Sequence, residues 1–247
     1  MRLLTLACAL LGTLAALALT ACESNQERSA KLEKVAKLHG GEAAKRRALA
    51  QRALTITRQS TRVKVIATAV VRGSEGAAAI VTLRNVSSTT LRDVPIQITV
   101  RDAHGASVYR NDIAGLSTTL LSAALLPAHA VLTWIDDQVQ ATGTPAGVTA
   151  EVGEGTPVTG AIPQLNVEGT HLTEGAEAEG NLVNHSAVAQ QELVVDAIAR
   201  RAGRIVAAGR AVLADVPAGA SAPFQLFFVG DPSGAQLEVS ALATTPG

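Results

Sequence analysis

The sequence predicts a mainly β protein in which two tandem antiparallel β-sandwiches follow an α-helical stalk. Three observations lead to this prediction. Residues 24–60 are rich in helix-forming side chains, whereas from residue 61 onwards apolar and polar residues alternate with the period of two that is typical of half-buried strands. A pattern of turns and strands then occurs twice, about 95 residues apart, which suits a duplicated domain rather than a solenoid repeat.

The N-terminal segment has the parts of a secretory signal. Arg2 precedes an apolar run that ends at Leu19, and Thr20-Ala21-Cys22 follows directly. Residues Leu19 to Cys22 resemble the bacterial lipobox, which implies cleavage before Cys22 and a diacylglycerol on its sulfur. Two alternatives are open. The run stays in the membrane as a helix, since about 20 apolar residues span a bilayer, or it is an ordinary signal with a cysteine there by chance.

We therefore expect a signal peptide over residues 1–21 and a mature chain anchored through Cys22 on the extracytoplasmic side of a bacterial cell envelope. At least two acyl chains on one cysteine suffice for stable attachment. Cys22 is then the sole cysteine of the mature chain, because Cys8 is discarded with the signal. The folded part must form without an intramolecular disulfide.

Residues 22–60 are expected to comprise the lipidated cysteine and the helical stalk. Glycines at positions 40 and 41 divide the stalk into two helical stretches, the second reaching about residue 57. Apolar residues recur at helical spacing in the first stretch, at Leu32, Val35 and Leu38. The stalk has three alternative places: packed on the first sandwich, lying on the membrane, or paired with another copy.

Charge is unevenly distributed, although the net charge of the chain is zero. Residues 23–60 contain nine Lys or Arg and four Asp or Glu, whereas residues 163–247 contain four and nine. A basic segment beside anionic headgroups favours membrane attachment. Nucleic acid is not expected as a partner, because the chain is exported and acidic at its far end.

The two sandwiches are predicted over residues 61–153 and 163–247, with a linker at 154–162. Asn85-Val86-Ser87 corresponds to Asn184-His185-Ser186, and alternating strands follow each turn at the same offset. Proline–alanine turns then precede the apolar strands that begin near Val131 and Phe224. We interpret both Asn-x-Ser triplets as turns rather than as glycosylation sites.

This order of strands and turns resembles the FxLyD-type immunoglobulin-like domains of bacterial envelope lipoproteins. The similarity is clearer in the second module than in the first, and the aromatic motif that names the family is not evident. The resemblance implies an immunoglobulin-like fold and an envelope location. It brings no catalytic residues with it.

Candidate chemical sites are few. The five histidines lack metal-ligand spacing, and no nucleophile elbow, phosphate-binding loop or dinucleotide fingerprint occurs. Asp136-Asp137 follows Trp134 at the end of a predicted strand, and Asp112 is a third carboxylate that could join them. These three residues are either the beginning of a calcium site or a solvated, charged turn.

The phenylalanines are confined to one strand. Alternation places Phe224 and Phe228 in the second core and leaves Phe227 to cover a contact between domains.

The function expected from these features is a non-catalytic one, in which a membrane-anchored envelope lipoprotein binds or scaffolds a partner. The partner is an envelope protein or a cell-wall polymer, no cofactor is expected, and self-association through the stalk is an alternative. A cell-wall or glycan-active enzyme, or an accessory subunit of one, is the second hypothesis. It requires a concave site with converging polar groups and perturbed carboxylates.

Overall fold

The computed structural model describes residues 24–39, 53–74 and 76–244. Within these ranges the chain is mainly β and all strand pairing is antiparallel, which confirms the predicted class. The described part has one α-helix, α1 (Asn25–His39), and one turn of 3-10 helix, η1 (Thr118–Leu120). The signal and lipobox predictions at residues 1–22 lie outside the described residues.

The first half of the chain forms two facing sheets, which we call the first sheet pair. One sheet has the order β1-β2-β6, with β1 (Val63–Arg72), β2 (Ala77–Asn85) and β6 (Val131–Val139). The other is built on β3 (Thr90–Arg101). It pairs along one edge with β4 (Ser107–Arg110) and β5 (Ser122–Leu126), and along the other with β7 (Gly147–Val152) and β8 (Thr156–Val158).

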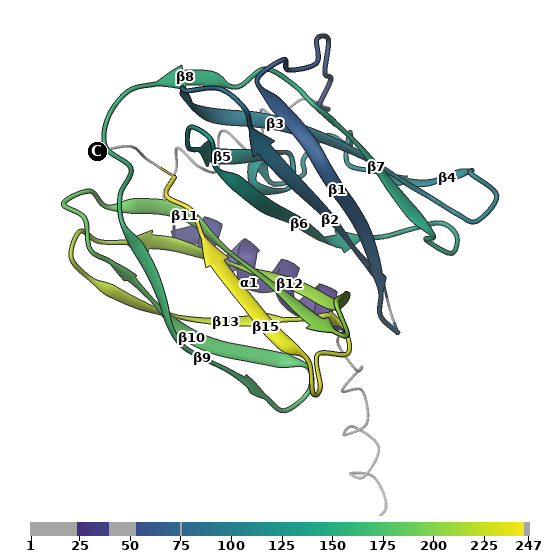
Figure 1. The fold of residues 1–247 in the computed structure, drawn as a ribbon. Coiled ribbons are helices and arrows are strands. Elements are labelled where there is room, and N and C mark those ends of the chain that lie inside the picture. The colour runs from purple at the N-terminus through teal and green to yellow at the C-terminus, as the bar shows by residue number, and fades with distance from the viewer. Residues whose placement is uncertain (1–23, 40–52, 75, 245–247) are drawn as a thin grey trace, which may run out of the picture.

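The second half forms a similar arrangement, the second sheet pair. One sheet has the order β13-β10-β9, with β9 (Leu165–Thr173), β10 (Glu177–Asn184) and β13 (Ser221–Phe227). The other has the order β14-β12-β11-β15, with β11 (Gln190–Arg201), β12 (Arg204–Val216), β14 (Val229–Gly230) and β15 (Gln236–Ala241). In Figure 1 the first pair lies above the second.

The two Asn-x-Ser turns have the same structure. Asn85 and Asn184 are fully buried, and each side-chain amide donates to three backbone carbonyls at 2.8–3.3 Å. The Oδ1 atom of each accepts from the backbone and the hydroxyl of the serine two residues later, at 3.0 and 2.7 Å. These residues therefore form turns, as predicted, and their burial is incompatible with glycosylation.

Each sheet pair encloses its own core. The first contains Trp134 and Tyr109 among aliphatic side chains, and the second contains Phe224, Leu226 and Phe228. Phe227 points to the other side of β13 and lies under the Arg28 guanidinium of α1, 5.3 Å from the ring centre. Alternation along this strand thus predicted the side on which each phenylalanine lies, although Phe227 contacts α1 and is not part of the apolar patch between the sheet pairs.

The stalk differs from its prediction in place and in extent. Helix α1 contacts β6 of the first pair and both β12 and β13 of the second, so it lies in the junction between them (Figure 1). Residues 53–60 are not helical, and residues 40–52, where most of the second helical stretch was expected, lie outside the described part. The predicted linker at 154–162 includes β8, which pairs with β3.

The buried face of α1 is also the opposite of the one its apolar spacing suggests. Gln26, Ser29 and Glu33 are 4–6% exposed, whereas Leu32 and Val35 are each 43% exposed. Residues at positions i, i+3 and i+7 share one side of a helix. Here that side is polar, because the surface it meets consists of charged side chains and strand carbonyls.

Candidate functional site

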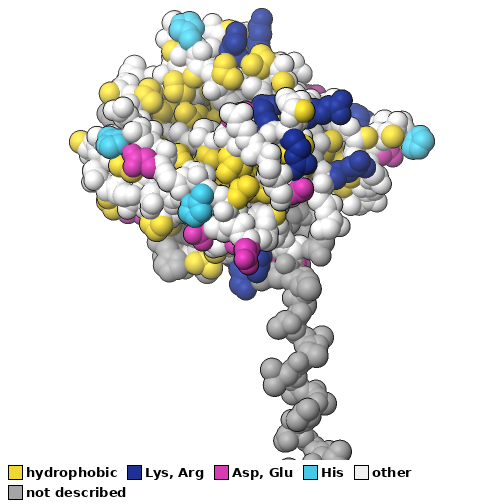
Figure 2. Space-filling model, turned by 60° about the horizontal axis from the view of Figure 1, so that its bottom comes forward, with side chains coloured by type: hydrophobic (Ala, Val, Ile, Leu, Met, Phe, Trp, Pro, Cys, Tyr) yellow, Lys and Arg dark blue, Asp and Glu magenta, His cyan; other side chains and the backbone are white. Residues whose placement is uncertain are grey.

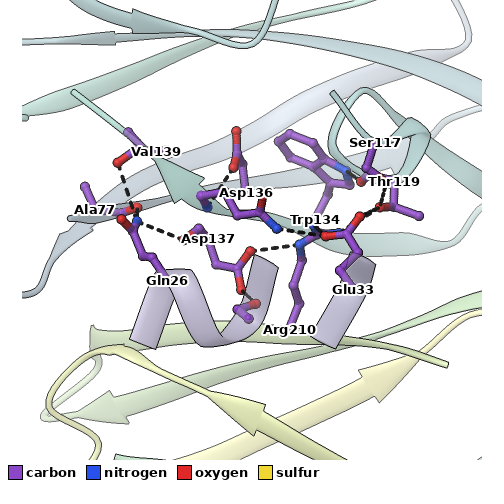
Figure 3. A network of polar contacts seen from close by, with 12 residues as sticks. Gln26, Glu33, Ala77, Ser117, Thr119, Trp134, Asp136, Asp137, Val139 and Arg210 are labelled. Atoms are coloured by element: carbon purple, nitrogen blue, oxygen red, sulfur yellow. Dashed lines mark hydrogen bonds and ion pairs between the residues drawn. The ribbon is translucent and has the colours of Figure 1, made fainter. Parts of the chain in front are cut away.

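The junction between the two sheet pairs contains the largest set of buried polar groups in the described part of the chain. It combines an apolar patch with a charged network. The apolar patch consists of Val71, Ala78, Ile80, Ile135, Ile198, Ala208 and Val229, which come from both pairs. The charged network lies beside it and is closed by α1 (Figure 3).

Arg210 on β12 is the centre of this network, and its side chain is 1% exposed. Its Nε donates to Asp137 of β6 at 2.9 Å, one terminal nitrogen donates to the Thr119 hydroxyl at 2.9 Å, and the other pairs with Glu33 of α1. Burial lowers the pKa of the guanidinium, but the carboxylates of Glu33 and Asp137 raise it by more. Arg210 therefore stays charged and joins three segments that are distant in the sequence.

The polar face of α1 completes the network. The Ser29 hydroxyl donates to Asp137 at 2.7 Å, and Glu33 also accepts from Gln138 at 2.8 Å and from Thr119 at 3.1 Å.

Gln26, on the same face of α1, donates to the carbonyls of Ala77 and Asp137, where a bulge interrupts the pairing of β2 with β6. An α1 side chain thus satisfies backbone groups that the sheet leaves open.

Two glycines make room for these contacts. A Cβ on Gly76 would lie 1.8 Å from the Oε1 atom of Gln26, and a Cβ on Gly209 would lie 2.2 Å from the carbonyl oxygen of Phe227. A larger residue at position 76 would displace the Gln26 side chain from its carbonyl partners, and one at position 209 would push the backbone at Phe227 away from β12.

The acidic pair of the sequence prediction is part of this junction. Asp136 and Asp137 are both fully buried within β6, so they do not form a solvated turn. As neighbours on a strand they point to opposite faces. Asp137 faces Arg210, whereas Asp136 faces the first core and accepts from the Tyr109 hydroxyl at 2.8 Å. Burial raises the pKa of Asp136 to about 6. The pKa of the Tyr109 hydroxyl is also raised, first by burial and then by the negative charge of Asp136.

Asp112, the third candidate metal ligand, lies apart from this pair. It pairs with Arg110 at 2.8 Å on the surface and accepts from Gln97 at 3.3 Å. Across the described residues no group of three or more His, Cys, Asp or Glu side chains is placed to hold a metal ion. The histidines visible in Figure 2 also lie apart from one another.

Asp196 of β11 is the functional candidate that sequence analysis missed. Asp196 is 9% exposed, and its Oδ1 atom is buried without a hydrogen-bond partner. Burial raises the pKa of Asp196 to about 8. Its position in an alternating strand resembles that of many exposed carboxylates, and only the packing of β6 against β11 makes it unusual.

The junction also has an open side, where Asp196 lines a cavity of about 200 Å³ between β6 and the β11–β15 strands. Larger hollows adjoin the beginning of α1, near Arg72 and Gly73. Among the described residues no helix is both long and apolar enough to cross a membrane.

Neither a protein-family model nor a curated protein sequence matches this chain.

Proposed function

We propose that this chain is a bacterial envelope lipoprotein, anchored by lipid on Cys22, in which two tandem immunoglobulin-like domains form one non-catalytic binding unit. The domains correspond to the two sheet pairs, and the twice-repeated buried asparagine turn supports their origin by duplication. The lipobox-like residues before Cys22 and the FxLyD-type order of strands support the anchor and the family.

The position of α1 carries this proposal. The helix begins at Asn25, three residues after the proposed lipid site, and its polar face is bonded to both sheet pairs. Only Glu23 separates Cys22 from Ser24 in the sequence, and two residues of chain span at most about 7 Å. The lipid therefore attaches to the rigid junction and not to a free stalk.

This attachment orients the unit on the membrane. Ser24 lines the same hollow as Arg72, the last residue of β1, and Gly230, the last residue of β14, at one end of both sheet pairs. That end faces the lipid headgroups, and the opposite end, with the asparagine turns, faces away. A partner in the envelope then meets the sides and the far end of the unit.

Replacement of the cysteine tests the anchor. In a bacterial host, the wild-type chain should incorporate an alkyne-labelled fatty acid and fractionate with membranes. Cys22→Ser should lose both properties, and Cys8→Ser should retain them because position 8 lies in the discarded signal. Unchanged labelling of Cys22→Ser would refute the lipoprotein proposal.

Crosslinking in intact cells tests the binding role. A photo-crosslinker at the exposed Val86, next to the first asparagine turn, should capture an envelope protein or a cell-wall polymer. The same crosslinker at Gly73, on the membrane-facing end, should capture lipid instead. Capture of neither class at either position would contradict the role and the orientation.

The enzymatic alternative has one observation in its favour, the raised pKa of Asp196 beside a cavity. A cell-wall or glycan hydrolase needs a second carboxyl group facing the same bond. Glu238 lines that cavity but is paired with Arg200 at 2.8 Å. Hydrolysis of purified peptidoglycan or glycan by the wild type, and its loss in Asp196→Asn, would favour the enzyme over the binding unit.

A further inference from the structure

The cavity on the open side of the junction is lined by side chains of mixed character. Thr133 and Ile135 of β6 form one wall, and the outward face of β11 and β15 forms the other. On that second wall lie Asp196, Ile198, Glu238 and Ser240. A smaller recess of about 40 Å³ shares Ile135 and Asp196 and extends toward Trp134 and Leu242.

Asp196 forms no ion pair within the described part of the chain, because Arg210, the cation opposite it, is bonded to other groups. In the pairing of β11 with β12, Asp196 lies directly opposite Arg210. Opposite charges at such positions usually interact. Arg210 instead directs its three nitrogens to Asp137, Thr119 and Glu33, so the carboxyl group of Asp196 receives no hydrogen bond from it.

The first sheet pair provides an internal comparison. Gln97 of β3 lies at the position that corresponds to Asp196, since both follow the buried asparagine by twelve residues. Gln97 does have a side-chain partner, because its amide donates to Asp112, which follows β4, at 3.3 Å. The unpaired acid is therefore specific to the second pair, where the cavity lies.

The charge around Asp196 favours a cation. Arg210 is a single positive group among the four buried acids Glu33, Asp136, Asp137 and Asp196. A buried carboxylate is costly unless it is paired. A metal ion would need more oxygen ligands than this wall offers. An ammonium group needs one carboxylate, and the aliphatic side chains of Ile135 and Ile198 suit a short alkyl chain beside it.

We propose that this cavity binds an alkylammonium group, whose nitrogen pairs with the Asp196 carboxylate while its carbon chain lies between Ile135 and Ile198. The group belongs to a small free amine or to a lysine side chain of a bound peptide. The proposal goes beyond the lipoprotein function and does not depend on lipid at Cys22.

Protonation is linked to this binding. With a pKa of about 8, Asp196 is mostly protonated at pH 7 and must lose its proton to pair with an ammonium group. Binding at pH 7 therefore releases a proton. Below pH 8 the affinity should rise about tenfold per pH unit as the competing proton is removed.

Calorimetric titration of the purified full chain with n-butylamine and with the peptide acetyl-Ala-Lys-Ala-amide tests the proposal and distinguishes the two sources. At least one probe should bind, and n-butanol, which lacks the charge, should not. Asp196→Asn should weaken binding at least tenfold. Asp215→Asn, which removes an exposed carboxylate from the neighbouring strand, should change it less than twofold.

Two further measurements keep the test decisive. Ser240→Trp places a bulky ring at the cavity and should abolish binding while leaving Asp196 in place. Titration in two buffers of different ionisation enthalpy should reveal the released proton. Equal affinity in the wild type and Asp196→Asn, or no binding of either probe at pH 8, would overturn the proposal without affecting the lipidation test.

Discussion

The two sheet pairs share a plan but differ along one strand. In the second pair, β12 runs unbroken beside β11 for 13 residues. In the first pair, the corresponding edge of β3 is divided into β4 and β5 by residues 111–121. Asn111 bridges the gap, since its side chain accepts from Ile98 and donates to the carbonyls of Ile96 and Leu120.

The asparagine turns, which stabilise each sheet pair, are the same in both, whereas the edge segments that form the junction differ. The asparagine turns are alike in both pairs because each closes its own core. The broken edge brings Thr119 of η1 to the junction, and the unbroken strand brings Arg210 to the same place. The two sheet pairs therefore have the same turns but different edges where they contact each other and α1.

The largest expected effect comes from removing the cation of the unbroken strand. Arg210→Met removes the cation that the buried carboxylates of Asp137 and Glu33 share, which should lower the free energy of unfolding by about 3–5 kcal/mol. Arg204→Met, on the exposed start of β12, should change it by less than about 0.5 kcal/mol. Urea denaturation of both variants provides the comparison, and equal midpoints would show that the junction does not stabilise the fold.

Replacing the buried asparagine of either turn with alanine should lower the free energy of unfolding by the same amount. Asn85→Ala and Asn184→Ala each remove a buried side-chain amide that donates to three backbone carbonyls and accepts from the serine two residues later, and each should cost about 3 kcal/mol. The two sites share no partner, so the double variant should show the sum of the single effects. Thermal unfolding measures this, and a large effect at one turn only would mean that the modules are not equivalent.

The unpaired acid of the second pair should make stability depend on pH. The pKa of Asp196 is about 8 in the folded chain and 3.8 in a free carboxyl, so its contribution to stability is greatest below pH 3.8 and decreases as pH rises to 8. Asp136, with a pKa of about 6, acts in the same direction between pH 3.8 and 6.

Between pH 6 and 8 we expect the free energy of unfolding to decrease by about 2 kcal/mol through Asp196. Asp196→Asn should remove this decrease and be more stable than the wild type at pH 8. Gln97→Asp, at the matching position of the first pair, introduces an acid beside Asp112 and serves as the comparison. An unchanged pH profile in Asp196→Asn would contradict the raised pKa.

The smallest expected effect lies on the broken edge. Thr119→Val removes a hydroxyl that contacts both Arg210 and Glu33 and should cost about 1 kcal/mol. Thr118→Val, at the exposed neighbouring position, should have almost no effect. Hydrogen exchange of α1 should also accelerate in Thr119→Val alone, because the helix loses one of its bonds to the first sheet pair.

Much of the fold was predictable because it depends on local pattern. Period-two alternation located the strands around residues 63–69, 94–101 and 131–135, and it assigned Phe224, Phe227 and Phe228 to their correct sides. The equal offsets after Asn85 and Asn184 revealed the repeat. Turns and half-buried strands leave such traces because one face of each strand must be apolar.

The junction left no comparable trace in the sequence. Leu32 and Val35 suggested an apolar helix face, yet α1 buries Gln26, Ser29 and Glu33 because it meets Arg210 and Asp137. Those partners lie between about 100 and 180 residues away in the chain, so no local spacing relates them.

The sequence by itself determined the mainly β class, the duplicated turns and the lack of a recognisable catalytic motif. Only the tertiary structure decided that α1 lies between the sheet pairs, that Asp136 and Asp137 are buried rather than solvated, and that Asp196 has no partner. The physical reason is that alternation reports which side of a strand is apolar, whereas the pairing of buried charges depends on which surfaces meet after the chain folds.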